Sequence, residues 1–176
     1  MQTIAFTVIG EPVTKGSVTS FVPKRADGSY ARRADGSPLV VKHDDMGRRG
    51  KAAAVTLANA ALAARTEARA PFYRHEALAI TLTFIHVRPR SHYGTGRNAH
   101  AVKGSAPAYP AKRPDVDKLT RHVLDACKGV LYHDDGQIVR LTVIEDYGDP
   151  ARTEVTLAPM AAQTTAALTH PQLLAV

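Results

Sequence analysis

The sequence predicts an α+β fold in which two main helices flank a small mixed β-sheet. Three observations lead to this prediction: strand-like alternation recurs at both ends and in the middle of the chain, two stretches show helical spacing, and long polar segments separate them. The expected order is strand, hairpin or loop, helix, strand, long loop, helix, strand, strand. We expect one domain over residues 1–158, because 44% of the 176 residues are hydrophobic, which suffices for a core.

The chain begins with a strand and a basic segment. Gln2 to Ile9 alternates and is rich in β-forming residues, which is typical of a strand. The pentapeptide RADGS then occurs twice, at 25–29 and 33–37, and each copy contains an Asp-Gly turn signal. In structure, this segment is either a hairpin or a floppy basic loop. In function, it is either an arm that faces DNA or a solvated loop. Its cations are Lys24, Arg25, Arg32 and Arg33.

A helix and a central strand are expected next. Asp44 and Asp45 are placed to cap an alanine-rich helix that runs to about Arg69. Residues 76–87 form the clearest strand of the chain, with apolar side chains on both faces, which favours a central position in the sheet. The helix is expected to pack through small and aliphatic side chains, namely Val55, Leu57, Ala58, Ala61 and Leu62.

Residues 88–114 form a long polar connection that contains no acidic residue. Loops of this length inside a compact domain are usually functional or disordered. We interpret this one as a flexible basic strap that holds a polyanion. Its cations are Arg88, Arg90, Arg97, Lys103, Lys112 and Arg113.

The last third of the chain predicts a helix and two strands. The helix runs from Val116 to Lys128, with Pro114 at its entrance and Gly129 at its exit. Strands are expected at 137–147 and 152–157. The uncharged tail, residues 159–176, is either disordered or packed at a subunit interface. The apolar stripe of the helix consists of Val116, Leu119, Val123, Cys127 and Val130.

Composition narrows the class of protein. Lys and Arg outnumber Asp and Glu by 23 to 16, a formal charge of +7, which favours an anionic partner such as nucleic acid. The single cysteine, Cys127, excludes an intrachain disulfide and is expected in the core. The N-terminus lacks the pattern of a signal peptide, and no stretch approaches the roughly 20 apolar residues of a membrane helix. We therefore expect a soluble, cytoplasmic protein without a membrane partner.

Four aspartates mark the candidate site. Asp115 and Asp117 stand at the start of the second helix, and Asp134 and Asp135 follow it. If the next strand runs beside the helix, the two pairs meet, and their mutual repulsion requires a cation. Hard carboxylate oxygens select Mg²⁺ or Mn²⁺ over zinc. A Mg²⁺ ion among them would equip the protein to hydrolyse phosphodiesters.

Other roles are open for several of these residues. Asp115 and Asp117 on their own are typical of a helix cap and a first-turn acid. Arg121 is placed either to neutralise charge on a phosphate or to form a helical salt bridge with Asp117 or Asp125. His122 and His133 are alternative general bases or metal ligands, although solvated histidines are commoner.

The stretch from Arg113 to Val139 resembles the RusA-type Holliday junction resolvases, small endonucleases found widely in phages and prophages. The start of the chain, Gly10-Glu11-Pro12-Val13 with Lys15 and Gly16, also looks like many phage members. The resemblance covers most of the first 158 residues and is tight only over 113–139. The shared pattern consists of Asp115, Asp117, Leu119, Arg121, Asp125-Ala126 and Asp134-Asp135-Gly136-Gln137-Ile138.

This resemblance implies Mg²⁺ as cofactor, a homodimer, and symmetric cleavage of a four-way DNA junction. It assigns metal binding to Asp115, Asp117 and Asp135, with Asp134 beside them. The family's catalytic lysine falls on Arg121, a departure that leaves either Arg121 or Lys118 for that role. Besides the strap cations, Lys15 and Lys118 are expected to bind DNA. The competing interpretations are a non-catalytic DNA-binding protein and a metal-dependent nuclease acting on another nucleic acid.

Overall fold

The computed structural model describes residues 2–15, 18–44 and 47–160 and confirms the α+β class and the predicted order of elements. Short 3-10 helices add turns within the loops. The strands are β1 (Ile4–Ile9), β2 (Val18–Phe21), β3 (Val41–Asp44), β4 (Leu78–His86), β5 (Ile138–Tyr147) and β6 (Arg152–Pro159). The helices are α1 (Gly47–Glu67), α2 (Val116–Cys127), η1 (Arg90–His92), η2 (Gly96–Asn98) and η3 (Asp135–Gln137).

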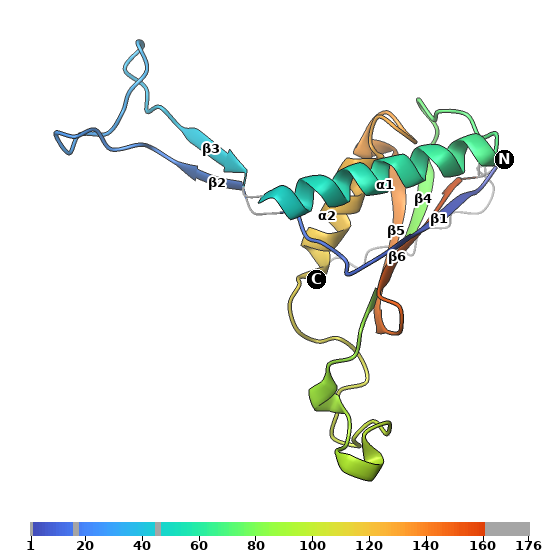
Figure 1. The fold of residues 1–176 in the computed structure, drawn as a ribbon. Helices are drawn as coiled ribbons and strands as arrows, with labels where there is room; N and C mark the ends of the chain where they lie inside the picture. Colours follow the sequence, from blue (N-terminus) through green and yellow to red (C-terminus); the bar gives the residue numbers. More distant parts are fainter. Residues whose placement is uncertain (1, 16–17, 45–46, 161–176) are drawn as a thin grey trace, which may run out of the picture.

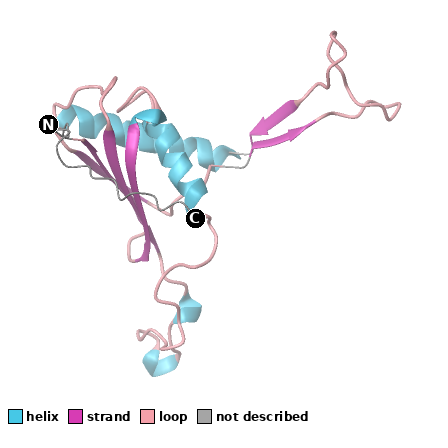
Figure 2. Cartoon of the chain, turned by 180° about the vertical axis from the view of Figure 1, so that it is seen from behind, coloured by secondary structure: helices cyan, strands magenta, loops and turns pink. Residues whose placement is uncertain are grey.

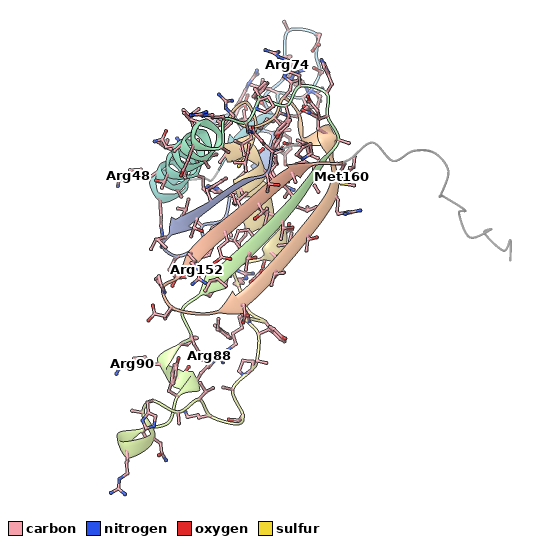
Figure 3. All side chains as sticks on the ribbon, turned by 90° about the vertical axis from the view of Figure 1, so that its right-hand side faces the viewer. Arg48, Arg74, Arg88, Arg90, Arg152 and Met160 are labelled. Atoms are coloured by element: carbon pink, nitrogen blue, oxygen red, sulfur yellow. The ribbon has the colours of Figure 1, made fainter. Side chains whose placement is uncertain are left out.

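A four-stranded mixed sheet in the order β1-β6-β4-β5 forms the body of the molecule (Figures 1 and 3). The central position of β4 is confirmed, since it pairs antiparallel with β6 and parallel with β5. Alternate β4 side chains, from Leu78 to Phe84, join one core with Leu57 of α1 and Leu119 of α2. Both helices therefore cover the same face of the sheet.

The first helix differs from its prediction at the N-terminus and on its sides. Asp44 is the last residue of β3, so it does not cap α1, while Asp45 lies outside the described residues. Leu57 and Ala61, one turn apart, are buried, but Val55 and Leu62 are 60% and 46% exposed. A single line of contacts joins α1 to the core, because the helix lies across the sheet and presents only a narrow stripe to it.

Two projections leave the body in different directions (Figures 1 and 2). One is the antiparallel pair β2–β3, which confirms the hairpin alternative. The other is the strap, which is more ordered than predicted. Arg88 donates to the carbonyls of Pro107 (2.8 Å) and Ala108 (3.2 Å), and Lys103 Nζ donates to the Ser91 carbonyl (2.9 Å).

The end of the chain contributes a register contact beyond β6. The Met160 amide donates to the Ala77 carbonyl (2.7 Å). Of the predicted tail, residues 159–176, Pro159 belongs to β6, and residues 161–176 lie outside the described residues. In the part of the chain that the structure describes, no helix combines the length and hydropathy needed to cross a bilayer.

The buried face of β4 offers a test of the core. Leu82 is 0% exposed, so Leu82→Ala is expected to cost about 2–5 kcal/mol of unfolding free energy, measured by urea denaturation. The matched control is Leu62→Ala, because that side chain is 46% exposed and its removal should cost less than about 0.5 kcal/mol. Equal losses in the two variants would contradict this assignment of the core.

Candidate active-site groove

The second helix begins where Asp115 turns from extended to helical backbone. Asp115 occupies the N-cap position with φ −75° and ψ 129°, but its side chain accepts no capping hydrogen bond. Its carboxylate pairs instead with Lys118 Nζ at 2.7 Å. The hydrogen bond from Lys118, and then the positive charges of Lys118 and Arg113, lower the pKa of Asp115 below its ordinary value. Asp115 is therefore held as a carboxylate at the entrance of α2.

A groove of about 470 Å³ runs along α2. One wall presents Asp117, Arg121 and Asp125, which follow one another at i, i+4 and i+8 and so share a helix face. Leu141 and Val143 of β5 lie on the other side, and Asp135 completes the lining. β5 and α2 thus border one groove that Asp117 and Asp135 both line, but within the described residues the two aspartate pairs do not gather into the single cluster that the sequence predicted.

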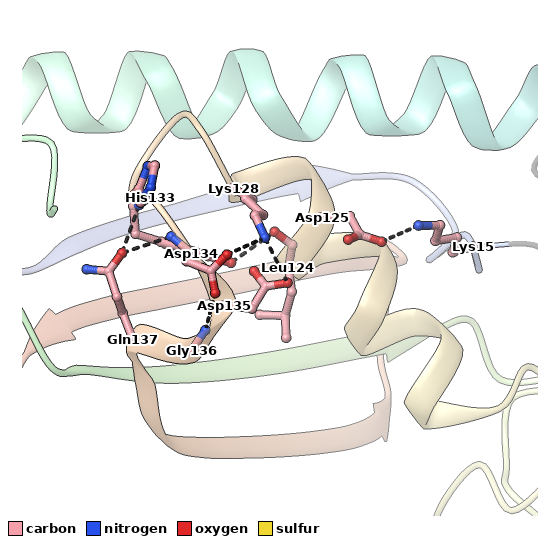
Figure 4. Close-up of polar contacts among 10 residues, drawn as sticks. Lys15, Leu124, Asp125, Lys128, His133, Asp134, Asp135, Gly136 and Gln137 are labelled. Carbon is pink, nitrogen blue, oxygen red and sulfur yellow. Dashed lines mark hydrogen bonds and ion pairs between the residues drawn. The ribbon is translucent and has the colours of Figure 1, made fainter. Parts of the chain in front are cut away.

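The two neighbouring aspartates after α2 have different surroundings (Figure 4). Asp134 Oδ1 accepts from the Gly136 amide (2.9 Å), and Oδ2 accepts from Lys128 Nζ (2.8 Å). Gln137 Oε1 accepts from the Asp134 amide (2.9 Å), which closes a capping box at the start of η3. Both carboxylate oxygens of Asp134 are therefore engaged in holding this turn.

Asp135 is oriented differently, toward the groove. Its Oδ2 lies 4.0 Å from Lys128 Nζ, and its Oδ1 is buried and accepts no hydrogen bond from the described residues. A buried oxygen without a donor is costly unless another partner meets it. Asp135 is therefore the aspartate of this pair that lines the groove, and its side chain is 41% exposed.

These residues fit a magnesium ion with few protein ligands. In the described part of the chain, no three His, Cys, Asp or Glu side chains are grouped closely enough to hold a metal. Asp117 and Asp135 share the groove, whereas Asp115 lies at the N-terminal end of α2 with Lys118. Mg²⁺ is usually held by one or two carboxylates, with water and phosphate oxygens filling the other positions. The donor set of Asp117 and Asp135 matches that habit.

A contact that the sequence did not predict lies beside the groove (Figure 4). Lys15 Nζ pairs with Asp125 Oδ2 at 2.6 Å, and the Lys15 amide donates to the Lys118 carbonyl at 3.3 Å. The two ends of this ion pair are 110 residues apart, so no local pattern reveals it. It ties the segment before β2 to the face of α2 that carries the candidate site.

The histidine alternatives do not enter the groove. His122 is 1% exposed and belongs to the buried side of α2, where burial lowers its pKa. The expectation that it serves as a general base or ligand is therefore wrong for this arrangement. Cys127 is confirmed as a core residue, and burial, with a smaller contribution from Asp135, raises the pKa of its thiol to about 12.

A second cavity, of about 350 Å³, lies where the strap meets the sheet. Lys112 and Arg113 line it, just before the start of α2. In its lining, the buried imidazole of His86 lies 3.4 Å from Glu145 and 3.8 Å from Glu11. Burial raises the pKa of Glu145, and His86 opposes that shift. The cavity brings two strap cations close to the start of α2.

The predicted DNA-binding cations divide into two groups. Arg88 and Lys103 hold the strap through its own carbonyls. Arg90 (Figure 3) and Arg97 are exposed on the strap. Sequence reasoning missed a further basic group at the start of α1, which has no acid in its first turn. This group consists of the exposed residues Arg48, Arg49 and Lys51.

Comparison with known proteins agrees with this site. The model of the endodeoxyribonuclease RusA family matches residues 41–158, more than half of the chain, and includes the whole groove. The chain therefore belongs to the RusA endodeoxyribonuclease family. The uncharacterized protein YqaN of Bacillus subtilis strain 168 is 38% identical over 53 residues, which is 30% of this chain. The match spans only 37% of that relative's length.

The Asp134 cap predicts a pH dependence of stability. The hydrogen bond from Lys128 lowers the pKa of Asp134 below its ordinary 3.8, so its ionised form stabilises the fold above that pH. Asp134→Ala should lower the urea midpoint at pH 7, and the difference from wild type should shrink as the pH falls below about 4. Asp134→Asn keeps an oxygen that accepts from the Gly136 amide, so its urea midpoint should fall less than that of Asp134→Ala. A difference independent of pH would contradict the ionic contribution.

Proposed function

We propose that this protein is a Mg²⁺-dependent, structure-selective DNA endonuclease that resolves four-way junctions by phosphodiester hydrolysis, with Mn²⁺ able to replace Mg²⁺. The proposal places it in DNA recombination and repair in the cytoplasm of a bacterial host, encoded by the host or by a prophage. One observation carries it: Asp117, Arg121 and Asp135 line a single groove inside the region that matches the RusA family.

Each side chain of the groove has a role in this proposal. Asp117 and Asp135 would hold the ion, and Asp115 would join them if Lys118 releases it on binding DNA. When bound, the ion supplies Lewis-acid polarisation of the scissile phosphate and lowers the pKa of the attacking water. In the hydrolysis, the water oxygen bonds to phosphorus, one P–O ester bond breaks, and the departing oxygen takes a proton from solvent.

Arg121 stands one turn from Asp117 and faces the same groove. Its guanidinium carries a permanent charge and cannot donate a proton near neutral pH, so its role is to offset negative charge that builds on the phosphate. Lys118, the alternative candidate, is engaged with Asp115 at 2.7 Å. We therefore assign the charge role to Arg121, and we assign to Lys118 the control of Asp115.

A homodimer would give the two cleavages that a four-way junction requires. Support for a partner comes from β5, which is an edge strand of the sheet. Its side chains Val139 and Ile144, which do not line the groove, are 61% and 46% exposed. Apolar side chains gathered on an unpaired edge are typical of an association surface. We propose that a second copy covers this edge.

Asp117→Asn tests the metal proposal. Wild type is expected to nick a labelled four-way junction with Mg²⁺ and not with EDTA. The variant should lose cleavage by about a hundredfold or more, because a catalytic metal supplies several kcal/mol and each 1.36 kcal/mol is tenfold in rate. Binding of the junction in EDTA should stay equal or tighten, since a charge that repels phosphate is lost.

The matched control is Asp149→Asn, an exposed aspartate in the turn after β5, which should cleave like wild type. Linear duplex, single-stranded DNA and RNA serve as substrate controls. If one of them is cleaved faster than the junction, that nucleic acid is the substrate and the junction assignment is wrong. Tight binding of the junction by wild type without any metal-dependent nicking would instead favour a DNA-binding protein that lacks catalysis.

Arg121 is tested by two substitutions. Arg121→Gln should reduce the cleavage rate by roughly ten- to a hundredfold, because it removes a fixed charge beside the phosphate. Arg121→Lys keeps that charge and should restore the rate to within about threefold of wild type. A lysine variant as slow as Arg121→Gln would contradict a role that depends on the positive charge alone, because Arg121→Lys retains that charge.

A further inference from the structure

The β2–β3 projection is an arm with a forked tip (Figures 1 and 2). Its strands pair antiparallel from Val18↔Asp44 to Phe21↔Val41. Between the strands, the chain forms two loops, which we call the prongs, one after the other, and they point in different directions (Figure 1). The loops correspond to the two copies of RADGS, 25–29 and 33–37. A two-stranded ribbon without a covering layer is marginally stable in water, so this arm suits a surface that meets a partner.

The two loops repeat the same hydrogen bonds. The Ser29 amide and hydroxyl donate to Asp27 Oδ1 at 2.9 and 2.7 Å, and those of Ser37 donate to Asp35 Oδ1 at 2.9 and 2.6 Å. The amides of Arg25 and Arg33 donate to the serine carbonyls, both at 2.8 Å. Arg25 and Arg33 therefore occupy the same position in two prongs of equal geometry.

Ala31 holds together the point where the two prongs meet. The Ala31 amide donates to the Pro23 carbonyl (2.8 Å), its carbonyl accepts from the Leu39 amide (2.9 Å), and it is 9% exposed. Arg32 Nη1 donates to the Gly36 carbonyl at 2.7 Å, which braces the second prong. Because the branch is held by backbone bonds, little ordering entropy remains to be lost when the tip binds.

The charges of the tip favour a polyanion. Four cations, Lys24, Arg25, Arg32 and Arg33, accompany two acids, Asp27 and Asp35. Both acids are turned inward to their own serines, and these hydrogen bonds lower their pKa values. Within the described ranges, none of these four cations forms an ion pair. Arg25 and Arg33 are exposed, whereas Lys24 lies over the ring of Tyr30 and Arg32 braces its prong.

The arm starts and ends beside other positive charges. The segment before it is bonded to α2 through Lys15, next to the candidate groove. The segment after it enters α1, whose first residues include exposed Arg48 and Arg49. The match to the RusA family begins at residue 41, so the forked tip lies wholly outside the region shared with that family.

We propose that the β2–β3 arm binds the phosphate backbone of a DNA duplex outside the catalytic groove, with Arg25 and Arg33 each contacting a phosphate. This inference rests on the proposed function, and it names a second contact on the same substrate, a duplex arm of the branched DNA. A two-stranded ribbon has the width to enter a major groove, which allows both prongs to reach the backbone.

The test compares Arg25→Gln/Arg33→Gln with wild type for binding to a labelled four-way junction in EDTA, over a range of salt concentrations. Two lost phosphate contacts should reduce the slope of log affinity against log salt by about 1.8. The ratio of the wild-type affinity to the variant affinity should therefore fall about twelvefold between 50 and 200 mM salt. A slope equal to that of wild type would overturn the proposal.

The matched control is Arg69→Gln/Arg74→Gln, two exposed arginines beyond the far end of α1, roughly 30 Å along that helix from the arm. This variant should keep the wild-type slope. Trimming the duplex arms of the junction should weaken binding by wild type and leave binding by the arm variant unchanged. Both variants and wild type should sediment identically. A change of oligomeric state without a change of slope would assign the arm to a second copy and overturn the DNA contact.

The two proposals fail in different ways. The salt slope is measured without metal and does not depend on cleavage, so an inactive wild type that still shows the slope difference counts against the nuclease alone. Metal-dependent cleavage by wild type together with equal slopes counts against the arm alone.

Discussion

The packing of α2 against β5 is the constraint on which the candidate site depends. The helix carries Asp117 and Arg121, the strand follows directly from the turn that holds Asp135, and the groove exists only where the two run side by side. The turn between them is kept in place by Asp134, whose carboxylate joins the Gly136 amide to Lys128. Asp134 thus uses both carboxylate oxygens to hold the turn, while its neighbour Asp135 lines the groove.

Charge compensation explains how so many aspartates coexist here. Lys118 pairs with Asp115, Lys128 with Asp134, and Lys15 with Asp125. These pairs are partly exposed, so each contributes little to stability. Their importance is electrostatic: among the described residues, Asp117 is left without an ion pair, and Asp135 has only Lys128 Nζ, at 4.0 Å. The basic strap and the forked arm surround this acidic centre with surfaces suited to a polyanion.

Local patterns were sufficient for most elements and for the face of α2. Alternation predicted β4 and its central position, and the spacing of Asp117, Arg121 and Asp125 predicted a shared helix face. Prediction was less successful where packing decides. The exposure of Val55 and Leu62 depends on how α1 lies across the sheet, which the alanine-rich sequence does not encode.

The amino-acid sequence by itself determined the order of elements, the two RADGS turns and the carboxylate pairs around α2, because each depends on neighbours only a few residues away. Tertiary structure alone decided which aspartate of each pair serves the fold and which faces the groove. It also decided the Lys15–Asp125 pair across 110 residues and the burial of His122. These features depend on which surfaces meet when the sheet and helices pack, and the free energy of that packing is shared among residues far apart along the chain.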